Sequence, residues 1–392
     1  MNVFDLLKDR DYIYQTSNDE GVEKLLSKPA TIYQGFDPSA DSFHAGHFMH
    51  LVTYKHLLNA GHSIIFLLGG VTGIIGDPTG RTKSRELLSE SKVRENIKAL
   101  EKQARKLLGT DSSIVFLNNA DWLTKAPIFD YLRHIAPYIS VNQLLNHETY
   151  KKRLAKKQNL SLLEFLYSSL QAWDFLHLFE EHNCRLQLGG QDQWVNILDG
   201  VELVRKVKGE EVFALTSPLL TVGGKKMGKS ERGTVWLDPQ KTSPYEFYQY
   251  WVNTPDDKLE QSLKLFTLLE LNEIEQIMKQ HPKEIQHRLA FEVTKFIHGE
   301  GAIKQAQKVP IVEFARPGLA NGQGQALIDV LVNSGLASSK SAARRLIEQG
   351  GVKLNKDVVT DSEKLITEDD FDSQNTATLQ VGKRKIVKLV LG

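Results

Sequence analysis

The chain contains the stretch Tyr33-Gln34-Gly35-Phe36-Asp37-Pro38-Ser39-Ala40-Asp41-Ser42-Phe43-His44-Ala45-Gly46-His47, from which much of the architecture can be predicted. Residues 30–33, just before the loop, are mostly β-branched or aromatic and predict a strand. After it, apolar residues recur at helical spacing from Phe48 to Leu58. The stretch is therefore a loop between a strand and a helix, and the free N–H groups that begin such a helix can bind an anion.

Two histidines mark the start of this helix. His44 and His47 are three residues apart, so they share one face of the first turn. Gly46 between them leaves room for a flat ligand to approach the backbone. The arrangement suits a nucleotide, although His-x-Gly-His taken alone is equally well explained by a helix N-terminus that happens to carry histidines.

Length and composition limit the possible classes of protein. A chain of 392 residues predicts two or three domains, and 25% charged with 41% hydrophobic residues is ordinary for a globular protein. The net charge is only +1, so a nucleic-acid surface would have to come from local clustering of basic residues. The single cysteine, Cys184, excludes an internal disulfide and a cysteine-based zinc site and is consistent with a reducing compartment.

No segment predicts insertion into a membrane. The longest apolar run, 63–68, is far shorter than the roughly 18 residues of a membrane span. The first ten residues have neither the apolar core of a signal peptide nor the acid-poor composition of a presequence. We therefore expect a cytoplasmic protein that does not bind membranes.

A second strand and loop follow the first helix. The apolar run 62–68 is bounded by glycines, as in a buried parallel strand, and strand, helix and strand in succession predict a doubly wound α/β sheet. Ligands of such sheets bind beyond the carboxyl ends of the strands, where the loop 73–85 places Asp77, Arg81 and Arg85. Asp77 could hold an ammonium group and the arginines a phosphate, although a solvated turn explains this loop better when it is taken alone.

A helix is predicted from Ser161, which forms a capping-box pattern with Glu164. Tyr167, Gln171 and Asp174 share one face of this otherwise apolar helix. Such a stripe either faces solvent or satisfies a buried polar ligand. From the residues alone, we favour solvent.

Two glycine-rich segments follow. Strand 185–190 ends in a glycine pair that would let a ligand lie against the backbone, and Asp192 and Gln193 beyond it can bond ribose hydroxyls or a carbonyl. The loop 219–230 then carries three lysines, including Lys226 and Lys229. A flexible loop with ammonium groups can close over a triphosphate and stabilise the charge on a leaving pyrophosphate.

The last third of the chain divides into a helical region, a linker and a charged tail. Helical patterns dominate from 244 to 307, and 315–324 is a linker rich in Gly, Pro and Asn. The tail from 325 concentrates basic residues before an acidic run at 357–372. A charged helix without a partner is the alternative explanation of this pattern, but together with the other motifs the pattern favours an RNA-binding surface. The basic residues in question are Lys340, Arg344, Arg345 and Lys353.

Together these motifs resemble the class I aminoacyl-tRNA synthetases, in the form of the bacterial-type tyrosyl-tRNA synthetases. The loop 35–47 resembles their first signature, with Ala45 where the family usually carries Ile or Leu. Lys226-Met227-Gly228-Lys229-Ser230 resembles the second, with Gly228 in place of Ser. The stripe at 167–174 looks like the family's tyrosine-binding helix and the tail like an S4-type RNA-binding domain, so the resemblance covers essentially the whole chain.

The resemblance implies a domain organisation. Residues 1–220 would form a Rossmann-like catalytic domain with a doubly wound parallel sheet and an inserted dimerisation segment. Residues 221–314 would carry the KMSKS-type loop and an α-helical anticodon-side domain, and 315–324 the linker. Residues 325–392 would form a small α+β S4-like domain, and the protein would be a homodimer.

The resemblance also implies an activity. L-tyrosine would react with ATP to give tyrosyl-adenylate and pyrophosphate, and the tyrosyl group would pass to the 3′ end of tRNA(Tyr). Mg²⁺ would accompany ATP, and no metal cluster bound by the protein is expected. The residues implied are Tyr33, Asp77, Tyr167, Gln171, Asp174 and Gln193 for tyrosine; Gly35, Asp37, Ser39, His44, Gly46, His47, Gly190, Asp192 and Lys229 for ATP; His44, His47, Arg81, Arg85, Lys226 and Lys229 for catalysis; and Lys340, Arg344, Arg345 and Lys353 for RNA.

Two alternatives stay open. A tryptophanyl-type synthetase or a His-x-Gly-His nucleotidylyltransferase would share the fold, but neither explains Tyr33, the stripe and the tail together. The chain could also be a catalytically idle relative that binds RNA through its tail. The charged residues of both signatures are intact, which argues against an idle protein.

Overall fold

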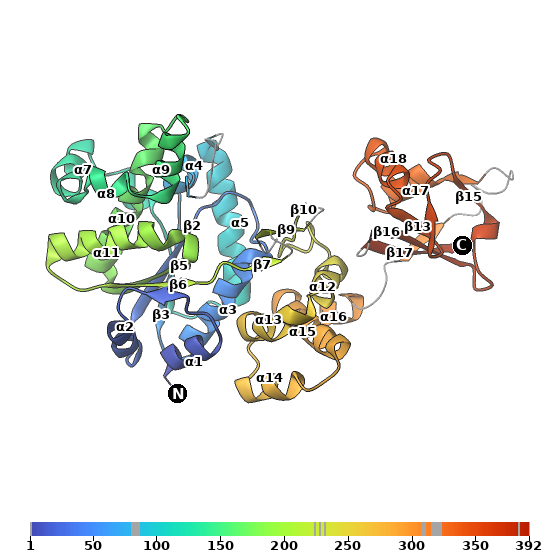
Figure 1. The fold of residues 1–392 in the computed structure, drawn as a ribbon, viewed down its shortest axis with the longest axis horizontal. Coiled ribbons are helices and arrows are strands. Elements are labelled where there is room, and N and C mark those ends of the chain that lie inside the picture. Colours follow the sequence, from blue (N-terminus) through green and yellow to red (C-terminus); the bar gives the residue numbers. More distant parts are fainter. Residues whose placement is uncertain are drawn as a thin grey trace. The chain divides into compact units, whose positions relative to one another are not determined.

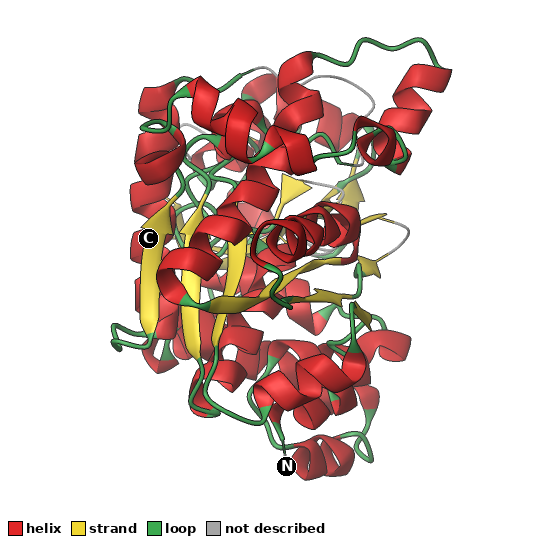
Figure 2. Ribbon diagram, turned by 90° about the vertical axis from the view of Figure 1, so that its left-hand side faces the viewer, coloured by secondary structure: helices red, strands yellow, loops and turns green. Residues whose placement is uncertain are grey.

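The computed structural model describes residues 2–79, 87–222, 225–226, 229–230, 233–306, 311–314, 324–382 and 385–391 (Figure 1). The chain forms two compact units, Met1–Asp238 with Glu260–Lys279, and Pro239–Leu259 with Gln280–Gly392. Helices predominate among the described elements, as the red ribbons of Figure 2 show. No helix among the described residues is both long enough and apolar enough to span a membrane.

A six-stranded sheet forms the centre of the first unit, and it confirms the predicted doubly wound α/β fold. Neighbouring strands are parallel, except that β1 runs antiparallel to β6. The order across the sheet is β1 (Gln15–Thr16), β6 (Phe213–Ser217), β5 (Cys184–Gly190), β2 (Thr31–Phe36), β3 (Ser63–Leu68) and β4 (Ile114–Asn118).

The order of the strands reverses between β2 and β5. The chain moves from β2 to β3 and β4 on one side, and from β5 to β6 on the other. Crossovers between parallel strands are right-handed, so the helices that connect these two series cover opposite faces of the sheet. A crevice therefore opens beyond the carboxyl ends of β2 and β5, where doubly wound folds bind ligands.

Four long helices cover the sheet (Figure 1). α3 (Ala45–Asn59) packs against β3 and α5 (Glu90–Leu108), whereas α10 (Leu162–His182) packs against β5 and α11 (Trp194–Lys208). The core under α10 includes Tyr33, Ile65 and Phe175. The shorter elements of this unit are α1 (Val3–Asp9), α2 (Asp19–Leu26), α4 (Thr72–Ile75), α6 (Ala120–Leu123), α7 (Ile128–His134), η1 (Ala136–Tyr138), α8 (Val141–Leu144), α9 (Glu148–Ala155), η2 (Gln191–Gln193), β7 (Thr221–Val222), β8 (Lys225–Lys226), β9 (Lys229–Ser230), β10 (Gly233–Thr234) and α14 (Leu271–Ile277), with α13 (Leu259–Phe266) at the boundary of the two units.

The second unit combines helices with a second sheet. α12 (Pro244–Val252), α15 (Pro282–His298) and α16 (Glu300–Ala306) pack on one another, and η3 (Asp256–Lys258) also belongs to this unit. Most of the predicted linker 315–324 lies outside the described residues. The predicted boundaries of the helical domain stay a prediction, because the two compact units divide the region 239–279 between them.

The tail forms the small α+β domain that the sequence predicts. Its sheet has the order β11 (Ile311–Phe314), β17 (Lys385–Leu391), β16 (Thr376–Val381), β13 (Val352–Leu354) and β14 (Asp357–Val359), antiparallel except for the pair β11 and β17. α17 (Leu327–Asn333) and α18 (Lys340–Glu348) pack together, and their buried residues Leu331 and Ile347 share one core with Leu379 of the sheet. The remaining elements are β12 (Gln325–Ala326), β15 (Leu365–Ile366) and η5 (Glu368–Asp370).

Candidate active site

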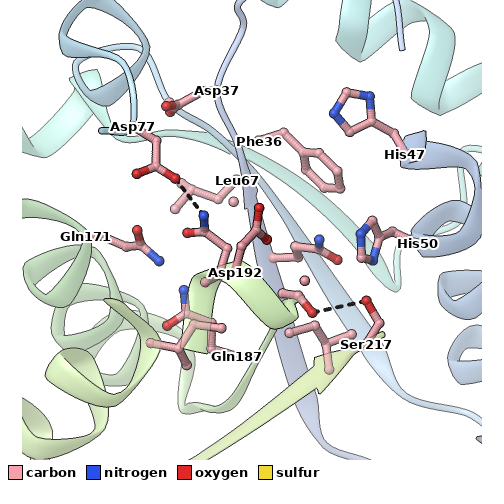
Figure 3. A pocket seen from close by; sticks show the side chains of 18 of the residues that line it. Phe36, Asp37, His47, His50, Leu67, Asp77, Gln171, Gln187, Asp192 and Ser217 are labelled. Carbon is pink, nitrogen blue, oxygen red and sulfur yellow. Dashed lines mark hydrogen bonds between the residues drawn. The ribbon is translucent and has the colours of Figure 1, made fainter. Parts of the chain in front are cut away.

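A cavity of about 410 Å³ opens in the first unit, beyond the carboxyl ends of the central strands (Figure 3). It brings together residues that the sequence assigns to the tyrosine and nucleotide sites from segments far apart in the chain. The predicted residues that line it are Tyr33, Gly35, Asp37, Ser39, His44, Gly46, His47, Asp77, Tyr167, Gln171, Asp174, Gly190, Asp192 and Gln193.

The structure does not describe the side chains of four predicted catalytic residues. Arg81 and Arg85 lie outside the described residues. Lys226 and Lys229 fall on the short strands β8 and β9, but their side chains lie outside the described part of the chain. Their assignments stay predictions.

The first signature forms a reciprocal cap at the start of α3. The N-cap residue His44 is extended (φ −119°, ψ 170°), and its Nδ1 accepts the Gly46 N–H at 3.0 Å. His47 Nδ1 in turn accepts the His44 N–H at 3.3 Å, and the two rings stack with centroids 3.8 Å apart. Because both Nδ1 atoms accept hydrogen bonds, each neutral ring carries its proton on Nε2 and can donate it to a ligand.

Burial keeps His47 neutral. Desolvation holds the pKa of His47 well below its ordinary value, and the neighbouring His44 and His50 lower it further. Neutral imidazoles can donate hydrogen bonds to a nucleotide without adding positive charge to the cavity. His47 therefore contributes no positive charge toward a triphosphate.

A strand-like pairing holds the first signature to the residues that follow the second. The Ala45 N–H donates to the Val235 carbonyl, and the Leu237 N–H donates to the Phe43 carbonyl, both at 2.8 Å. The Trp236 ring lies 6.3 Å from that of His44. The segment that leaves β10 is thus fixed to the first turn of α3, a contact that the sequence did not predict.

Asp37 lies partly buried beside α10. It accepts hydrogen bonds from the Thr72 hydroxyl and the Tyr167 hydroxyl, each at 2.8 Å. Desolvation, followed by the charge of Asp77, raises the pKa of Asp37 to about 6. A side chain at Gly69 would bring its Cβ within 2.4 Å of the Asp37 carboxylate, so the close approach of this strand end requires glycine.

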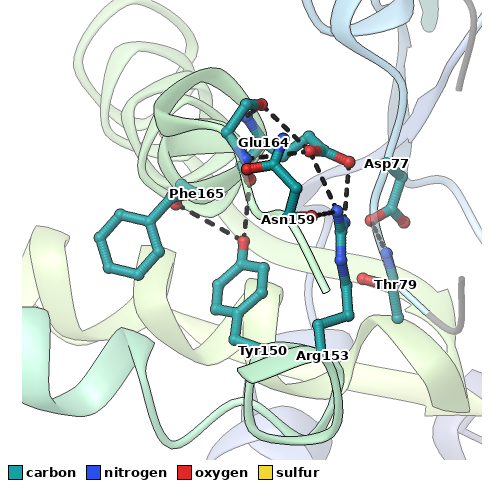
Figure 4. Close-up of polar contacts among 8 residues, drawn as sticks. Asp77, Thr79, Tyr150, Arg153, Asn159, Glu164 and Phe165 are labelled. Carbon is teal, nitrogen blue, oxygen red and sulfur yellow. Dashed lines mark hydrogen bonds and ion pairs between the residues drawn. The ribbon is translucent and has the colours of Figure 1, made fainter. Parts of the chain in front are cut away.

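Asp77 is held between two donors. Its carboxylate accepts the Thr79 N–H at 2.8 Å and the side-chain amide of Gln193 at 2.6 Å (Figures 3 and 4). Both predicted residues therefore meet in the ligand-free cavity. A carboxylate fixed in this way can receive an ammonium group with little rearrangement.

Asp174 forms the buried end of the cavity. The Trp122 indole N–H donates to its carboxylate at 2.8 Å, and the Asn119 amide donates at 3.0 Å. Burial raises the pKa of Asp174 to about 7, despite these two hydrogen bonds. The Asn119 amide also reaches the Thr72 hydroxyl at 3.1 Å, so a continuous chain of hydrogen bonds links Asp174 to Asp37.

The hydroxyl of Tyr33 is buried near Asp174 without a hydrogen-bond partner in the described structure. Desolvation, followed by the charge of Asp174, raises the pKa of Tyr33 well above its ordinary value. A buried polar group without a partner is costly unless a ligand satisfies it. This end of the cavity therefore favours a ligand that carries a hydroxyl group.

The solvent-facing reading of the stripe on α10 is wrong. Tyr167 and Asp174 are 5% and 3% exposed, and both line the cavity together with Gln171. The predicted capping box at Ser161 and Glu164 is confirmed. Hydrophobic periodicity identified the helix but could not distinguish a polar face that meets solvent from one that meets an enclosed site.

A buried polar cluster behind the cavity fixes the first turn of α10 (Figure 4). Arg153 pairs with Glu164 at 2.8 Å, and Glu164 also accepts the Ser161 N–H at 3.2 Å. The Tyr150 hydroxyl donates to the Glu164 carbonyl at 3.0 Å. This cluster sets the position of the helix that carries Tyr167, Gln171 and Asp174.

Sequence reasoning missed several residues of the site. Asn119 and Trp122 follow the apolar run Ile114-Val115-Phe116-Leu117, much as Asp77 follows the apolar run 63–68, and this was the available signal. Gln34 and Gln187 also line the cavity, each with a buried side-chain oxygen that has no partner in the described part. Among the described residues, no group of three or more His, Cys, Asp or Glu side chains is arranged to hold a metal ion.

The predicted RNA-binding residues lie on the tail domain. Ser339 caps α18 by accepting the Ala342 N–H at 3.2 Å, and Arg344 and Arg345 are exposed on that helix. Lys353 is exposed on β13, whereas Lys340 pairs with an aspartate, Asp329, at 2.7 Å.

Comparisons with known proteins agree with this site. The family described as tRNA synthetases class I (W and Y) matches residues 25–314, and the S4 domain matches residues 327–372. The tyrosine–tRNA ligase of Acetivibrio thermocellus is 43% identical over 99% of this chain and 100% of its own length. That of Clostridium botulinum is 42% identical over 100% of this chain and 99% of its own length.

Solved structures show the same likeness. The C-terminally truncated mitochondrial tyrosyl-tRNA synthetase of Aspergillus nidulans superposes with a TM-score of 0.72 at 32% identity, over 78% of this chain and 92% of its own. The tyrosyl-tRNA synthetase of Archaeoglobus fulgidus, at 17% identity and a TM-score of 0.58, shares the fold over 78% of this chain and 99% of its own. The chain belongs to the tyrosyl-tRNA synthetase family of class I tRNA synthetases.

Proposed function

We propose that this chain is an active tyrosine–tRNA ligase. It joins L-tyrosine to ATP, releases pyrophosphate, and transfers the tyrosyl group to the 3′ end of tRNA(Tyr). The observation that carries the proposal is a single cavity in which a buried end with Tyr33 and Asp174 adjoins the paired histidines of a helix N-terminus. A phenol and a nucleotide can therefore be held side by side.

The buried end would bind the tyrosine side chain. The Tyr33 hydroxyl and the Asp174 carboxylate suit a phenolic hydroxyl, which can both donate and accept. Asp77, Tyr167 and Gln171 would hold the ammonium group, and Gln193 the carboxylate end. Asp37, assigned to ATP from the sequence, hydrogen-bonds Tyr167, so we place it at the junction of the two substrates.

The other end would bind ATP. His44 and His47 would donate their Nε2–H groups to phosphate oxygens, and Gly46 leaves the backbone open to the nucleotide. Asp192 would accept from the ribose, next to Gly190. A Cβ at Gly190 would lie 2.8 Å from the Asp192 carboxylate, which supports a close approach there. Gly35 and Ser39 would complete this end.

The reaction needs positioning and charge stabilisation and no covalent enzyme intermediate. The tyrosine carboxylate is itself the nucleophile, and it attacks the α-phosphorus as pyrophosphate leaves. Arg81, Arg85, Lys226 and Lys229 would stabilise the negative charge on the departing pyrophosphate. Mg²⁺ would enter with the ATP phosphates, as is usual for this ion.

Two further proposals concern assembly. Ile128, Phe129 and Leu162 of the inserted segment and its flank are 65%, 77% and 71% exposed, which supports a homodimer formed through this segment. Arg344, Arg345 and Lys353 would meet tRNA phosphates, with Lys340 at the edge of the same surface.

We place the protein in the cytoplasm, in keeping with its single buried cysteine.

Amino-acid-dependent exchange of pyrophosphate into ATP tests the proposal. All twenty amino acids should be compared, and only tyrosine should support fast exchange; tRNA(Tyr) should then be charged. Exchange driven by tryptophan would identify a tryptophanyl-type enzyme instead. Absence of exchange with any amino acid, combined with binding of structured RNA, would identify an idle relative.

A further inference from the structure

A third histidine of α3 lines the nucleotide end of the cavity. His50 lies three residues after His47, is 8% exposed, and belongs to neither signature. In Figure 3, the His50 ring and the Ser217 side chain both point into the cavity. Its Nδ1 lies 3.1 Å from the hydroxyl of Tyr12, a fully buried residue between α1 and β1.

The protons at this contact can be accounted for. Two other hydroxyls, those of Thr53 and Ser217, lie near the Tyr12 oxygen. Each of these hydroxyls donates its own proton to a backbone carbonyl. Thr53 donates to the Met49 carbonyl at 3.0 Å, and Ser217 donates to the Gly189 carbonyl at 3.3 Å. The Tyr12 proton is therefore available for His50, and an imidazole nitrogen is a better acceptor than a hydroxyl oxygen.

We propose that Tyr12 is a positioning residue that donates to His50 Nδ1 and so fixes the His50 tautomer that presents Nε2–H to the ribose of ATP. The ribose is the part of ATP in question because Asp192, which we assign to the sugar, lies within electrostatic range of His50. A carboxylate acceptor and an imidazole donor would then serve the same sugar. This inference rests on the proposed function, since it assumes that ATP occupies the cavity.

His50 can fill this role only as a neutral ring. Burial lowers the pKa of His50 to about 4, with the charge of Asp192 opposing the shift and His44 adding to it. The ring is therefore neutral near pH 7, and a neutral ring offers one donor and one acceptor. Because Tyr12 occupies the acceptor, the donor remains for the ligand.

Four variants separate this role from simple packing. Tyr12→Phe removes the hydroxyl and keeps the ring. His50→Gln keeps an amide N–H close to the position of Nε2 and no longer needs Tyr12 to orient a proton. The double variant completes a cycle, and Tyr54→Phe is a matched control, because Tyr54 is another fully buried tyrosine whose hydroxyl has no side-chain partner among the described residues.

Tyr12→Phe should raise KM for ATP about two- to ten-fold in pyrophosphate exchange, as expected for one hydrogen bond between neutral groups, and should leave KM for tyrosine unchanged. His50→Gln supplies the second background, and its own KM for ATP is the reference there. In the His50→Gln background, Tyr12→Phe should have no further effect on KM for ATP. Tyr54→Phe should not change KM for ATP.

The nitrogen chemical shifts of His50 give a readout that packing alone would not produce. In ¹⁵N-labelled full-length protein without ATP, the wild type should show the Nε2–H tautomer, and Tyr12→Phe should show a mixture. An Nδ1–H tautomer in the wild type would overturn the proposal, as would an unchanged KM for ATP in Tyr12→Phe or an equal effect of that substitution in both backgrounds. If no amino acid supports exchange in the wild type, the proposed function fails instead, while the tautomer measurement still decides the role of Tyr12.

Discussion

The cavity of the first unit and the basic face of α18 both carry charged side chains, but they differ in burial: Asp174 of the cavity is buried and hydrogen-bonded, whereas the arginines of α18 are exposed. We define the basic face of α18 as Lys340, Arg344 and Arg345. Asp174 is 3% exposed and has two donors, whereas Arg344 and Arg345 are exposed and have no acidic partner among the described residues.

This difference predicts how much each residue contributes. A buried charge interacts in a medium of low effective dielectric, so the loss of one partner is costly. An exposed cation is screened by water and salt, so each contact with a phosphate contributes little by itself. Substitutions in the cavity should therefore have large effects on one substrate, and substitutions on α18 should have small, salt-dependent effects on tRNA.

The largest effect is expected for Asp174→Asn. An amide at this position offers only one oxygen to the Asn119 and Trp122 donors, so a buried donor loses its partner, and the phenol loses a charged acceptor. We expect kcat/KM for tyrosine to fall about a hundredfold or more, with little change in KM for ATP. Asp121→Asn, on the exposed side of α6, is the control and should behave as wild type. Wild-type affinity of Asp174→Asn for tyrosine would show that this carboxylate does not meet the substrate.

The second prediction concerns pH and Asp37. Burial raises the pKa of Asp37 from 3.8 to about 6. Between these values the folded protein binds more protons than the unfolded chain, so the contribution of Asp37 to stability falls as pH rises from about 4 to 6. Asp37→Asn lacks this penalty. The free energy of unfolding of Asp37→Asn minus that of the wild type should therefore increase as pH rises, by up to about 3 kcal/mol.

Denaturant unfolding of the ligand-free protein at several pH values between 4 and 7.5 measures this difference. Asp111→Asn provides a control of opposite sign. Hydrogen bonds from Ser113 lower the pKa of this exposed carboxyl, so its contribution is present at neutral pH and is lost as pH falls. A difference between Asp37→Asn and wild type that does not vary with pH would contradict the burial argument.

Tyr33→Phe should change stability and substrate preference, and both effects should be smaller than those of the two substitutions above. The substitution removes a buried hydroxyl that has no partner in the described structure, so the ligand-free protein should become slightly more stable, by about 1 kcal/mol. The same hydroxyl would bond the substrate phenol, so the preference for tyrosine over phenylalanine should fall about three- to ten-fold. Thermal unfolding and exchange with both amino acids test the two halves. A stabilised variant with unchanged discrimination would remove Tyr33 from the phenol site.

Local patterns predicted the elements that build the cavity. Apolar runs bounded by glycine located β3 and β5, and the Ser161 and Glu164 pair located the start of α10. These signals are local because a strand or a helix start depends on a few neighbouring residues. The fold class and fourteen of the residues that line the cavity followed from them and from the resemblance.

Contacts between distant segments could not be predicted. The contact of Trp122 with Asp174 depends on where the sheet order places β4, which Trp122 follows. The pairing of Val235 with Ala45 depends on the path of the chain after β10. Tyr12 meets His50 only when α3 is in place on the sheet. No spacing in the sequence records these distances, because each depends on the packing of complete elements.

The smallest effects per residue are expected on the basic face of α18. Replacing Arg344 and Arg345 with alanine should weaken tRNA binding modestly at low salt and reduce its salt dependence, with somewhat less than one unit of slope lost for each phosphate contact. Lys340→Ala should weaken tRNA binding less than either arginine substitution, because its ammonium group already pairs with Asp329 at 2.7 Å. The measurement is tRNA affinity at several salt concentrations, alongside tyrosine-dependent pyrophosphate exchange, which should be unchanged in every variant. An unchanged salt slope in the double variant would mean that α18 does not contact tRNA, whereas a loss of exchange would show that this face influences the cavity and would break the contrast between the two regions.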